Sequence, residues 1–254
     1  MEGKVKLELK GVDKVFHLGR TKVNDVQVVF DINFQVFEKE FVIICGPSGS
    51  GKSTILSILI GLEHPTKGKV FHDGIDIYKL KRDKRAKLRL HSIGIVLQQS
   101  IWLKNMTVVE NVAMPYFLSG HGYRESIEKA TEMLKKIKMD EYVKRLPSEL
   151  SGGQQQKIAL VRSLMNDPDI LVADEPTGNL DTDSSTVLMD QLVELNEKFH
   201  KTIIVVTHNL SYLKLADRSF YVKDGHLSKV DFSLKHTLQN TGVESISDIE
   251  KMAK

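Results

Sequence analysis

The sequence is poor in cysteine, in long apolar runs and in net charge, and each shortage excludes a class of protein. Cys45 is the single cysteine among 254 residues, so no disulfide can form within the chain. No apolar run approaches the roughly 18–20 residues that a membrane-spanning helix requires. Lysine and arginine number 36 against 33 aspartates and glutamates, so the charge gives no support to a basic nucleic-acid-binding module.

What is present is the pattern of a globular protein that alternates strands and helices. Hydrophobic residues make up 41% of the chain and charged residues 27%. Short apolar runs at 40–46, 93–97, 169–175 and 201–208 are typical of buried strands, and helical patterns lie between them. This alternation predicts a mostly parallel sheet with flanking helices.

Two additions to this core are predicted. Alternating patterns at 5–9 and 28–37 indicate half-buried strands, and 68–77 is predicted to be a hairpin with Asp73-Gly74 at its turn. The middle of the chain holds several helical patterns and few strand signals, so we predict an inserted helical subdomain at about 99–165.

The segment GPSGSGKST, at 46–54, has the spacing of a phosphate-binding loop, with Gly46, Gly51, Lys52 and Ser53 at the defining positions. It follows a predicted buried strand and begins a predicted helix, which favours this interpretation over an ordinary glycine-rich turn. Backbone N–H groups and the helix N-terminus would bind phosphate oxygens. Lys52 would reach the β- and γ-phosphates, and the Ser53 hydroxyl would bind Mg²⁺. We expect Cys45 to be a small buried apolar side chain.

A second candidate site lies at the end of the apolar run ILVADE, at 170–175. Ligands bind at the carboxyl ends of strands in open α/β sheets. Asp174 can therefore hold Mg²⁺ there, and Glu175 can orient or deprotonate a water that attacks the γ-phosphate.

The segment LSGGQ at 150–154, placed between these two motifs, resembles the signature of ATP-binding cassette (ABC) ATPases. The resemblance covers about residues 5–228. It implies an α/β fold with a P-loop NTPase core, an N-terminal antiparallel β subdomain and an inserted α-helical subdomain, as a single domain at 1–229. The polar tail at 230–254 lies outside it.

The same resemblance assigns roles to particular residues. Glu175, His208 and Lys52 would be catalytic; Ser151, Gly152, Gly153 and Gln154 would form the signature; and Asp181 would belong to the D-loop. Mg²⁺ would be held by Ser53, Gln98 and Asp174. The residues implied to bind ATP are Phe16, Gly46, Ser48, Gly49, Ser50, Gly51, Lys52, Ser53, Thr54 and Gln98.

In the family, two copies pack head-to-tail, and each signature helix caps the ATP held by the phosphate loop of the other copy. The segments DEPTGNLD and NVAMPYFLSG are similar to the MacB/LolD/FtsE branch. That branch implies an ATPase subunit, at the cytoplasmic face of the inner or plasma membrane, that drives a separate permease docked near Gln98–Met106. Such a subunit would drive lipoprotein or peptide export, or mechanotransmission in the cell envelope. The alternative is a cytosolic, non-transport ABC ATPase that acts as an ATP-gated switch.

Two further features leave alternatives open, and two residues depart from the family pattern. Trp102 can be a permease contact or can pack within the helical subdomain. The cationic stretch at 79–91 is better explained as a solvated helix face than as a site for anionic lipids. Phe16 stands where the family usually has a tyrosine that stacks on adenine, and the resemblance implies that its ring can stack in the same way. Lys39 stands where the family usually has a glycine, so the turn at Lys39 is expected to be reshaped.

Overall fold

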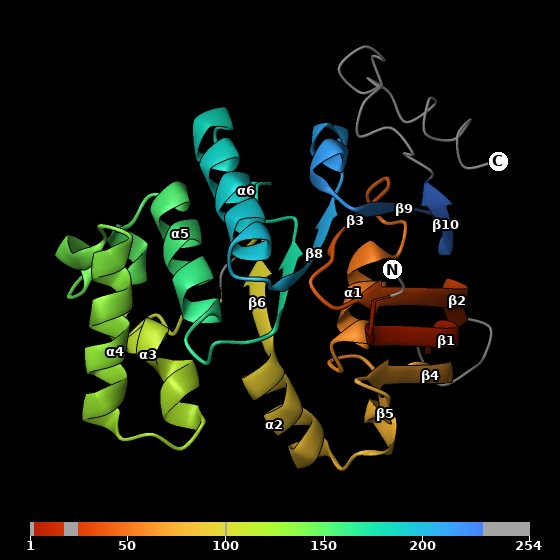
Figure 1. The fold of residues 1–254 in the computed structure, drawn as a ribbon, viewed down its shortest axis with the longest axis horizontal. Helices are drawn as coiled ribbons and strands as arrows, with labels where there is room; N and C mark the ends of the chain where they lie inside the picture. Colours follow the sequence, from red (N-terminus) through yellow and green to blue (C-terminus); the bar gives the residue numbers. More distant parts are fainter. Residues whose placement is uncertain (1–2, 18–24, 100, 231–254) are drawn as a thin grey trace. The chain divides into compact units, whose positions relative to one another are not determined.

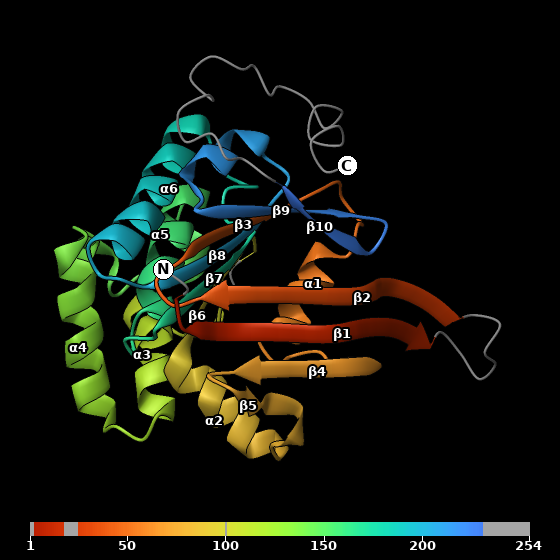
Figure 2. The same cartoon turned by 45° about the vertical axis from the view of Figure 1, so that its right-hand side comes forward.

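The computed structural model describes residues 3–17, 25–99 and 101–230. They fall into two compact units, one formed by residues up to 85 together with those from 202 onward, and the other by residues 86–201. Each unit combines strands with helices, which confirms the predicted α/β class (Figures 1 and 2). No helix in the described ranges is both long and apolar enough to cross a bilayer.

The first unit contains an antiparallel sheet in the order β2, β1, β4, β5, whose long strands lie side by side in Figure 2. Leu9 of β1 lies opposite Phe34 of β2 on one side and Val70 of β4 on the other. The strand predicted at 5–9 continues to His17. The register shifts between Leu9 and Val12 as in a β-bulge, so the alternating pattern is interrupted although the pairing continues. The strands are β1 (Val5–His17), β2 (Asp25–Phe37), β4 (Lys67–His72) and β5 (Ile75–Asp76).

The first unit also contains a set of parallel strands. Strand β3 (Phe41–Cys45) lies between β8 (Thr202–Thr207) and β9 (Arg218–Lys223) and is parallel to both. All residues of β3 and β8 are buried, as expected for strands covered on both faces. Helix α1 (Lys52–Leu59) follows β3, and a short 3-10 helix spans Leu210–Leu215.

Turn residues decide where several of these strands end. The predicted turn at Asp73-Gly74 is confirmed, and both residues have positive φ, 45° and 79°, as a two-residue hairpin turn requires. A second Asp-Gly pair at 224–225 separates β9 from β10 (His226–Val230). Lys39 has φ of 64°, so the turn keeps the left-handed conformation that a glycine would adopt there.

In the second unit, β6 (Ile93–Leu97) pairs in parallel with β7 (Ile170–Asp174). Three helices, α3, α4 and α5, enclose an apolar core that includes Val112, Leu134 and Ile158, and they lie close together in Figure 1. Helix α5 begins directly after Ser151 as the signature pattern predicts. The helices are α2 (Arg82–Ser92), α3 (Val108–Leu118), α4 (Tyr123–Lys136), α5 (Gly152–Ser163) and α6 (Thr182–Glu197).

Candidate nucleotide-binding and hydrolysis site

The loop at 46–54 connects β3 to α1 and has a backbone that only glycine permits at two positions. Gly46 has φ of 151°, and a Cβ atom there would lie 2.1 Å from the carbonyl oxygen of Val222. Gly51 has φ of 101°, and its Cβ would lie 2.7 Å from the carbonyl oxygen of Val28. The loop therefore wraps against neighbouring backbone and leads into the N-terminal end of α1, whose backbone N–H groups favour an anion.

Lys52 and Ser50 give this loop the chemistry of a polyphosphate site. Lys52 is only 6% exposed, and its Nζ donates to the carbonyl oxygens of Gly46 and Pro47 at 2.9 and 2.8 Å. The hydroxyl of Ser50 is buried with no hydrogen-bond partner among the described residues. A cavity of about 170 Å³ opens here, lined by Val28 and residues 49–54. A buried cation beside an unsatisfied hydroxyl fits a phosphate group.

Strand register brings His208 to the same sheet edge as the loop, within the first unit. Cys45 of β3 is paired with Thr207 of β8. The next residues along the chain, Gly46 and His208, therefore leave the sheet together at the carboxyl ends of these strands. His208 is exposed at this edge, as a residue that meets a ligand must be.

The same register argument applies within the second unit. Leu97 of β6 is paired with Asp174 of β7, so Gln98 and Glu175 also leave the sheet together. Glu175 has φ of 46°, a left-handed backbone that costs a non-glycine residue about 1–2 kcal/mol. Such strain collects at functional sites, where it fixes the direction of a side chain.

Gln98 is held close to the segment that follows Glu175. The amide of Asn179 donates to the carbonyl oxygen of Gln98 at 3.3 Å. A Cβ atom on Gly178 would lie 2.6 Å from Gln98 Nε2, so a larger residue would displace the glutamine. A cavity of about 150 Å³ is lined by Gln98, Gln99, Gly152, Gln155, Gln156, Pro176, Asn179 and Leu180.

The signature residues form the N-terminus of α5. The backbone N–H of Gln154 donates to Ser151 Oγ at 3.3 Å, and the backbone N–H of Ser151 donates to Gln154 Oε1 at 2.8 Å. This is a capping box, and it leaves Gly152 and Gly153 as the first two residues of the helix. Gln154 Nε2 also donates to the hydroxyl of Tyr142 at 2.9 Å, a contact that the sequence did not indicate.

Asp181 begins α6 as its N-cap. Its carboxylate accepts hydrogen bonds from the backbone N–H and the hydroxyl of Ser184, at 2.8 and 2.9 Å. These bonds lower the pKa of Asp181 below its ordinary value. The predicted D-loop aspartate therefore fixes the start of a helix.

Gln156 ties α5 to both segments that carry predicted active-site residues in the second unit. Its side chain is 4% exposed, and Nε2 donates to the carbonyl oxygens of Leu97 and Pro176, both at 2.9 Å. Leu97 precedes Gln98, and Pro176 follows Glu175. The sequence pattern did not predict this role. Three consecutive glutamines on a helix nevertheless point in directions about 100° apart, so they can reach three different segments.

The middle glutamine, Gln155, holds Trp102. The indole N–H of Trp102 donates to Gln155 Oε1 at 2.9 Å, and the Arg162 guanidinium lies 4.5 Å from the indole centroid. Trp102 also packs against the apolar core of the helices, which supports packing within the subdomain rather than an exposed contact. Its neighbours Ile101 and Leu103 are the exposed apolar residues, at 72% and 47%.

Phe16 lies on β1 opposite Val26 of β2 and is half-buried. The ammonium of Lys14 lies 4.7 Å from the centroid of its ring. The predicted ATP-stacking residue therefore carries a cation on one face.

Comparisons with known proteins agree with this geometry. A model of the ABC transporter family matches residues 29–178. The lipoprotein-releasing system ATP-binding protein LolD of Buchnera aphidicola is 34% identical over 227 residues, which cover 89% of this chain and 98% of LolD. The macrolide export ATP-binding/permease protein MacB of Mannheimia succiniciproducens is 39% identical over 235 residues, which cover 92% of this chain and 36% of MacB.

A solved structure is similar over nearly the same length. It is the dimeric ATP-binding cassette MJ0796 of Methanocaldococcus jannaschii in a post-hydrolysis state bound to ADP and Pi. It is 37% identical, has a TM-score of 0.80, and the match covers 88% of this chain and 98% of that one. The chain therefore belongs to the ABC transporter family, as an ATP-hydrolysing nucleotide-binding subunit of the branch that contains LolD and MacB.

Proposed function

We propose that residues 1–229 form one ATPase domain that binds Mg-ATP at its phosphate loop. The N–H groups of residues 46–54 would bind the phosphates, and Lys52 would exchange its two carbonyl partners for phosphate oxygens. Ser53, Gln98 and Asp174 would hold Mg²⁺. The bound ion would neutralise phosphate charge as the terminal phosphate leaves.

The observation that carries this proposal is the strand register. Cys45 pairs with Thr207, and Leu97 pairs with Asp174, so each pair of strands delivers its two predicted site residues to one edge. At the end of β7, Glu175, whose backbone is strained, would orient the attacking water and accept its proton. His208 would contact the γ-phosphate.

We further propose that two copies pack head-to-tail, so that each signature meets the ATP bound by the other copy. Ser151 and Gly152 are exposed at the N-terminus of α5, where backbone N–H groups favour phosphate. Gly153 and Gln154 would complete this contact. The dimeric state of the related MJ0796 cassette supports such an assembly, and Asp181 would lie close to the interface.

We propose that the chain drives a separate membrane permease. The permease would dock on Gln98–Met106 and on a cavity of the second unit. Ile101 and Leu103 are exposed there, and the cavity of about 360 Å³ is lined by apolar side chains such as Ile95 and Leu118. Arg89 and Arg162 also line it. An apolar permease helix that carries a carboxylate would match both the surface and the charge.

The work we propose is lipoprotein or peptide export, or mechanotransmission in the cell envelope, with the chain at the cytoplasmic face of the membrane. The relatives named LolD and MacB support this choice. A cytosolic switch is not favoured, because the similar proteins are transporter subunits.

The Glu175→Gln variant tests the proposal. It keeps the shape of the side chain but removes the base, so we expect the ATPase kcat to fall about 10²–10⁴-fold. ATP should then hold the variant as a dimer in gel filtration. The same substitution at Glu197, exposed at the end of α6, should change neither property.

Two outcomes would contradict the proposal. Wild-type turnover by the Glu175→Gln variant would remove Glu175 as the base. Purification of the tagged variant with ATP from detergent-solubilised membranes should recover a stoichiometric permease, and recovery of soluble proteins alone would exclude the transport role.

A further inference from the structure

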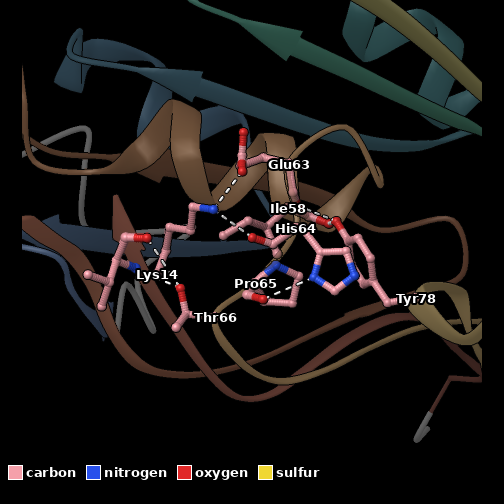
Figure 3. Close-up of polar contacts among 8 residues, drawn as sticks. Lys14, Ile58, Glu63, His64, Pro65, Thr66 and Tyr78 are labelled. Atoms are coloured by element: carbon pink, nitrogen blue, oxygen red, sulfur yellow. Dashed lines mark hydrogen bonds and ion pairs between the residues drawn. The ribbon is translucent and has the colours of Figure 1, made fainter. Parts of the chain in front are cut away.

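The cation over Phe16 is fixed in place by the chain that leaves α1. Lys14 is 9% exposed, and its Nζ lies 2.6 Å from Glu63 Oε1 and donates to the carbonyl oxygen of His64 at 2.8 Å. Figure 3 shows the Lys14 side chain extended toward both residues. The ammonium therefore stays over the ring instead of moving freely in solvent.

The turn that holds Lys14 is itself anchored. The Tyr78 hydroxyl shares its single proton between the carbonyl oxygens of Ile58, at 2.8 Å, and Glu63. The Tyr78 and His64 rings lie 4.4 Å apart, centroid to centroid. Glu63 and His64 therefore present a carboxylate and a carbonyl from a position set by several contacts (Figure 3).

The same segment is attached to the backbone of β1 next to Phe16. The backbone N–H of Val15 donates to Thr66 Oγ1 at 2.9 Å, and the backbone N–H of Thr66 donates to the carbonyl oxygen of Asp13 at 2.8 Å. Because α1 begins at Lys52 in the phosphate loop, the chain from α1 to Thr66 connects the phosphate site directly to the strand that carries Phe16.

We propose that Lys14 is a positioning residue for the base of the bound nucleotide. It occupies one face of the Phe16 ring, so the base is directed to the opposite face. It also draws π-electron density from the ring, which strengthens stacking with an electron-rich purine. This inference rests on the proposed function and on the expectation, taken from the family resemblance, that Phe16 stacks on the adenine of ATP.

The role is separable from phosphate binding, because Lys14 contacts the ring and the turn but is not among the residues that line the phosphate cavity. Removing the Lys14 charge should weaken the binding of ligands that carry a base and should leave the binding of ligands that carry only phosphates unchanged. Inorganic tripolyphosphate is a matched probe, since it has the three phosphates of ATP without the base.

The experiment compares Lys14→Met with the wild type by calorimetric titration of ATP and of tripolyphosphate. Methionine keeps the length of the side chain without the charge. We expect the Kd for ATP to rise about threefold to tenfold, the range of a partly desolvated cation–π contact. The Kd for tripolyphosphate should not change, and Lys14→Arg should restore ATP binding.

Two further variants separate the possible failures. In a Phe16→Ala background, Lys14→Met should have no additional effect on ATP, because the ring through which it acts is absent. In Lys14→Met/Glu63→Gln, the carboxylate that loses its lysine partner is replaced by a neutral amide. If the defect in ATP binding came only from the unpaired carboxylate, it would disappear in this double variant. That disappearance would overturn the inference.

An equal loss of ATP and tripolyphosphate binding in Lys14→Met would also overturn it, since that result indicates a general disturbance of the fold. If Phe16→Ala weakens ATP but Lys14→Met does not, the inference fails and the proposed function stands. If Phe16→Ala leaves ATP binding unchanged, the assignment of Phe16 fails, and the inference fails with it.

Discussion

Replacing Gln156 with leucine should separate the contribution of its buried amide from that of its volume. The substitution keeps a side chain of similar size but removes the donor that serves Leu97 and Pro176 at 2.9 Å each. A buried carbonyl left without a donor costs about 1–3 kcal/mol. The bond to Pro176 is fully buried and the bond to Leu97 is partly buried, so we expect the free energy of unfolding to fall by about 2–4 kcal/mol.

Urea unfolding measures this change, with the slope against urea concentration expected to stay constant. Gln191→Leu is the matched control, because Gln191 Oε1 is buried with no hydrogen-bond partner among the described residues. Removing an unsatisfied oxygen should leave stability unchanged or raise it. We also expect the kcat of Gln156→Leu to fall, since the two carbonyls flank Gln98 and Glu175.

A Gln156→Leu variant within about 0.5 kcal/mol of wild type, the range of an unremarkable surface change, would refute this reasoning. So would a loss of the same size in Gln191→Leu. The first result would mean that water replaces the hydrogen bonds of the Gln156 amide without cost. The second would mean that the change of side-chain shape, and not the loss of the donor, lowers stability.

Two other predictions concern the partly buried Trp102 and the buried Cys45. Trp102→Ala should lower the free energy of unfolding, measured in urea, by about 2–4 kcal/mol. The reason is that the indole packs on the helical core and donates a hydrogen bond to Gln155. Unchanged stability with weaker permease binding would instead favour the hypothesis of an exposed contact. Burial raises the pKa of the Cys45 thiol from near 9 to about 12, so iodoacetamide at pH 8 should label Cys45 only in urea, as mass spectrometry can show. Since only the unfolded thiol ionises readily above pH 9, stability should fall from there toward pH 12, and rapid labelling of the folded protein would contradict the buried state.

The sequence predicted those parts of the molecule that depend on neighbouring residues. Residues 46–54 carry their own glycine spacing, Asp73-Gly74 carries its own turn, and LSGGQ at 150–154 carries its own signature, so each was identified from a few consecutive letters. The family resemblance added roles for Gln98, His208 and Asp181 that no local pattern assigns.

Contacts between residues far apart in the chain could not be predicted in this way. The bulge in β1 disguised the second half of the strand as irregular, since alternation breaks where the register shifts. Likewise the pairing of Lys14 with Glu63, or of Gln156 with Leu97, depends on which segments the completed fold brings together. Periodicity gives the face of an element but not the partner that it meets.

The phosphate loop cannot form all of its contacts during synthesis until the turn between β9 and β10 has been translated. The backbone N–H of Gly225 donates to the carbonyl oxygen of Ser50 at 3.0 Å, and its own carbonyl accepts from Phe30. Some 175 residues must therefore be translated after Ser50 before this support exists, which takes roughly 9–35 s at bacterial and eukaryotic elongation rates. During that interval nucleotide cannot stabilise the nascent chain through a finished loop, so early folding must depend on local contacts of the first strands and α1.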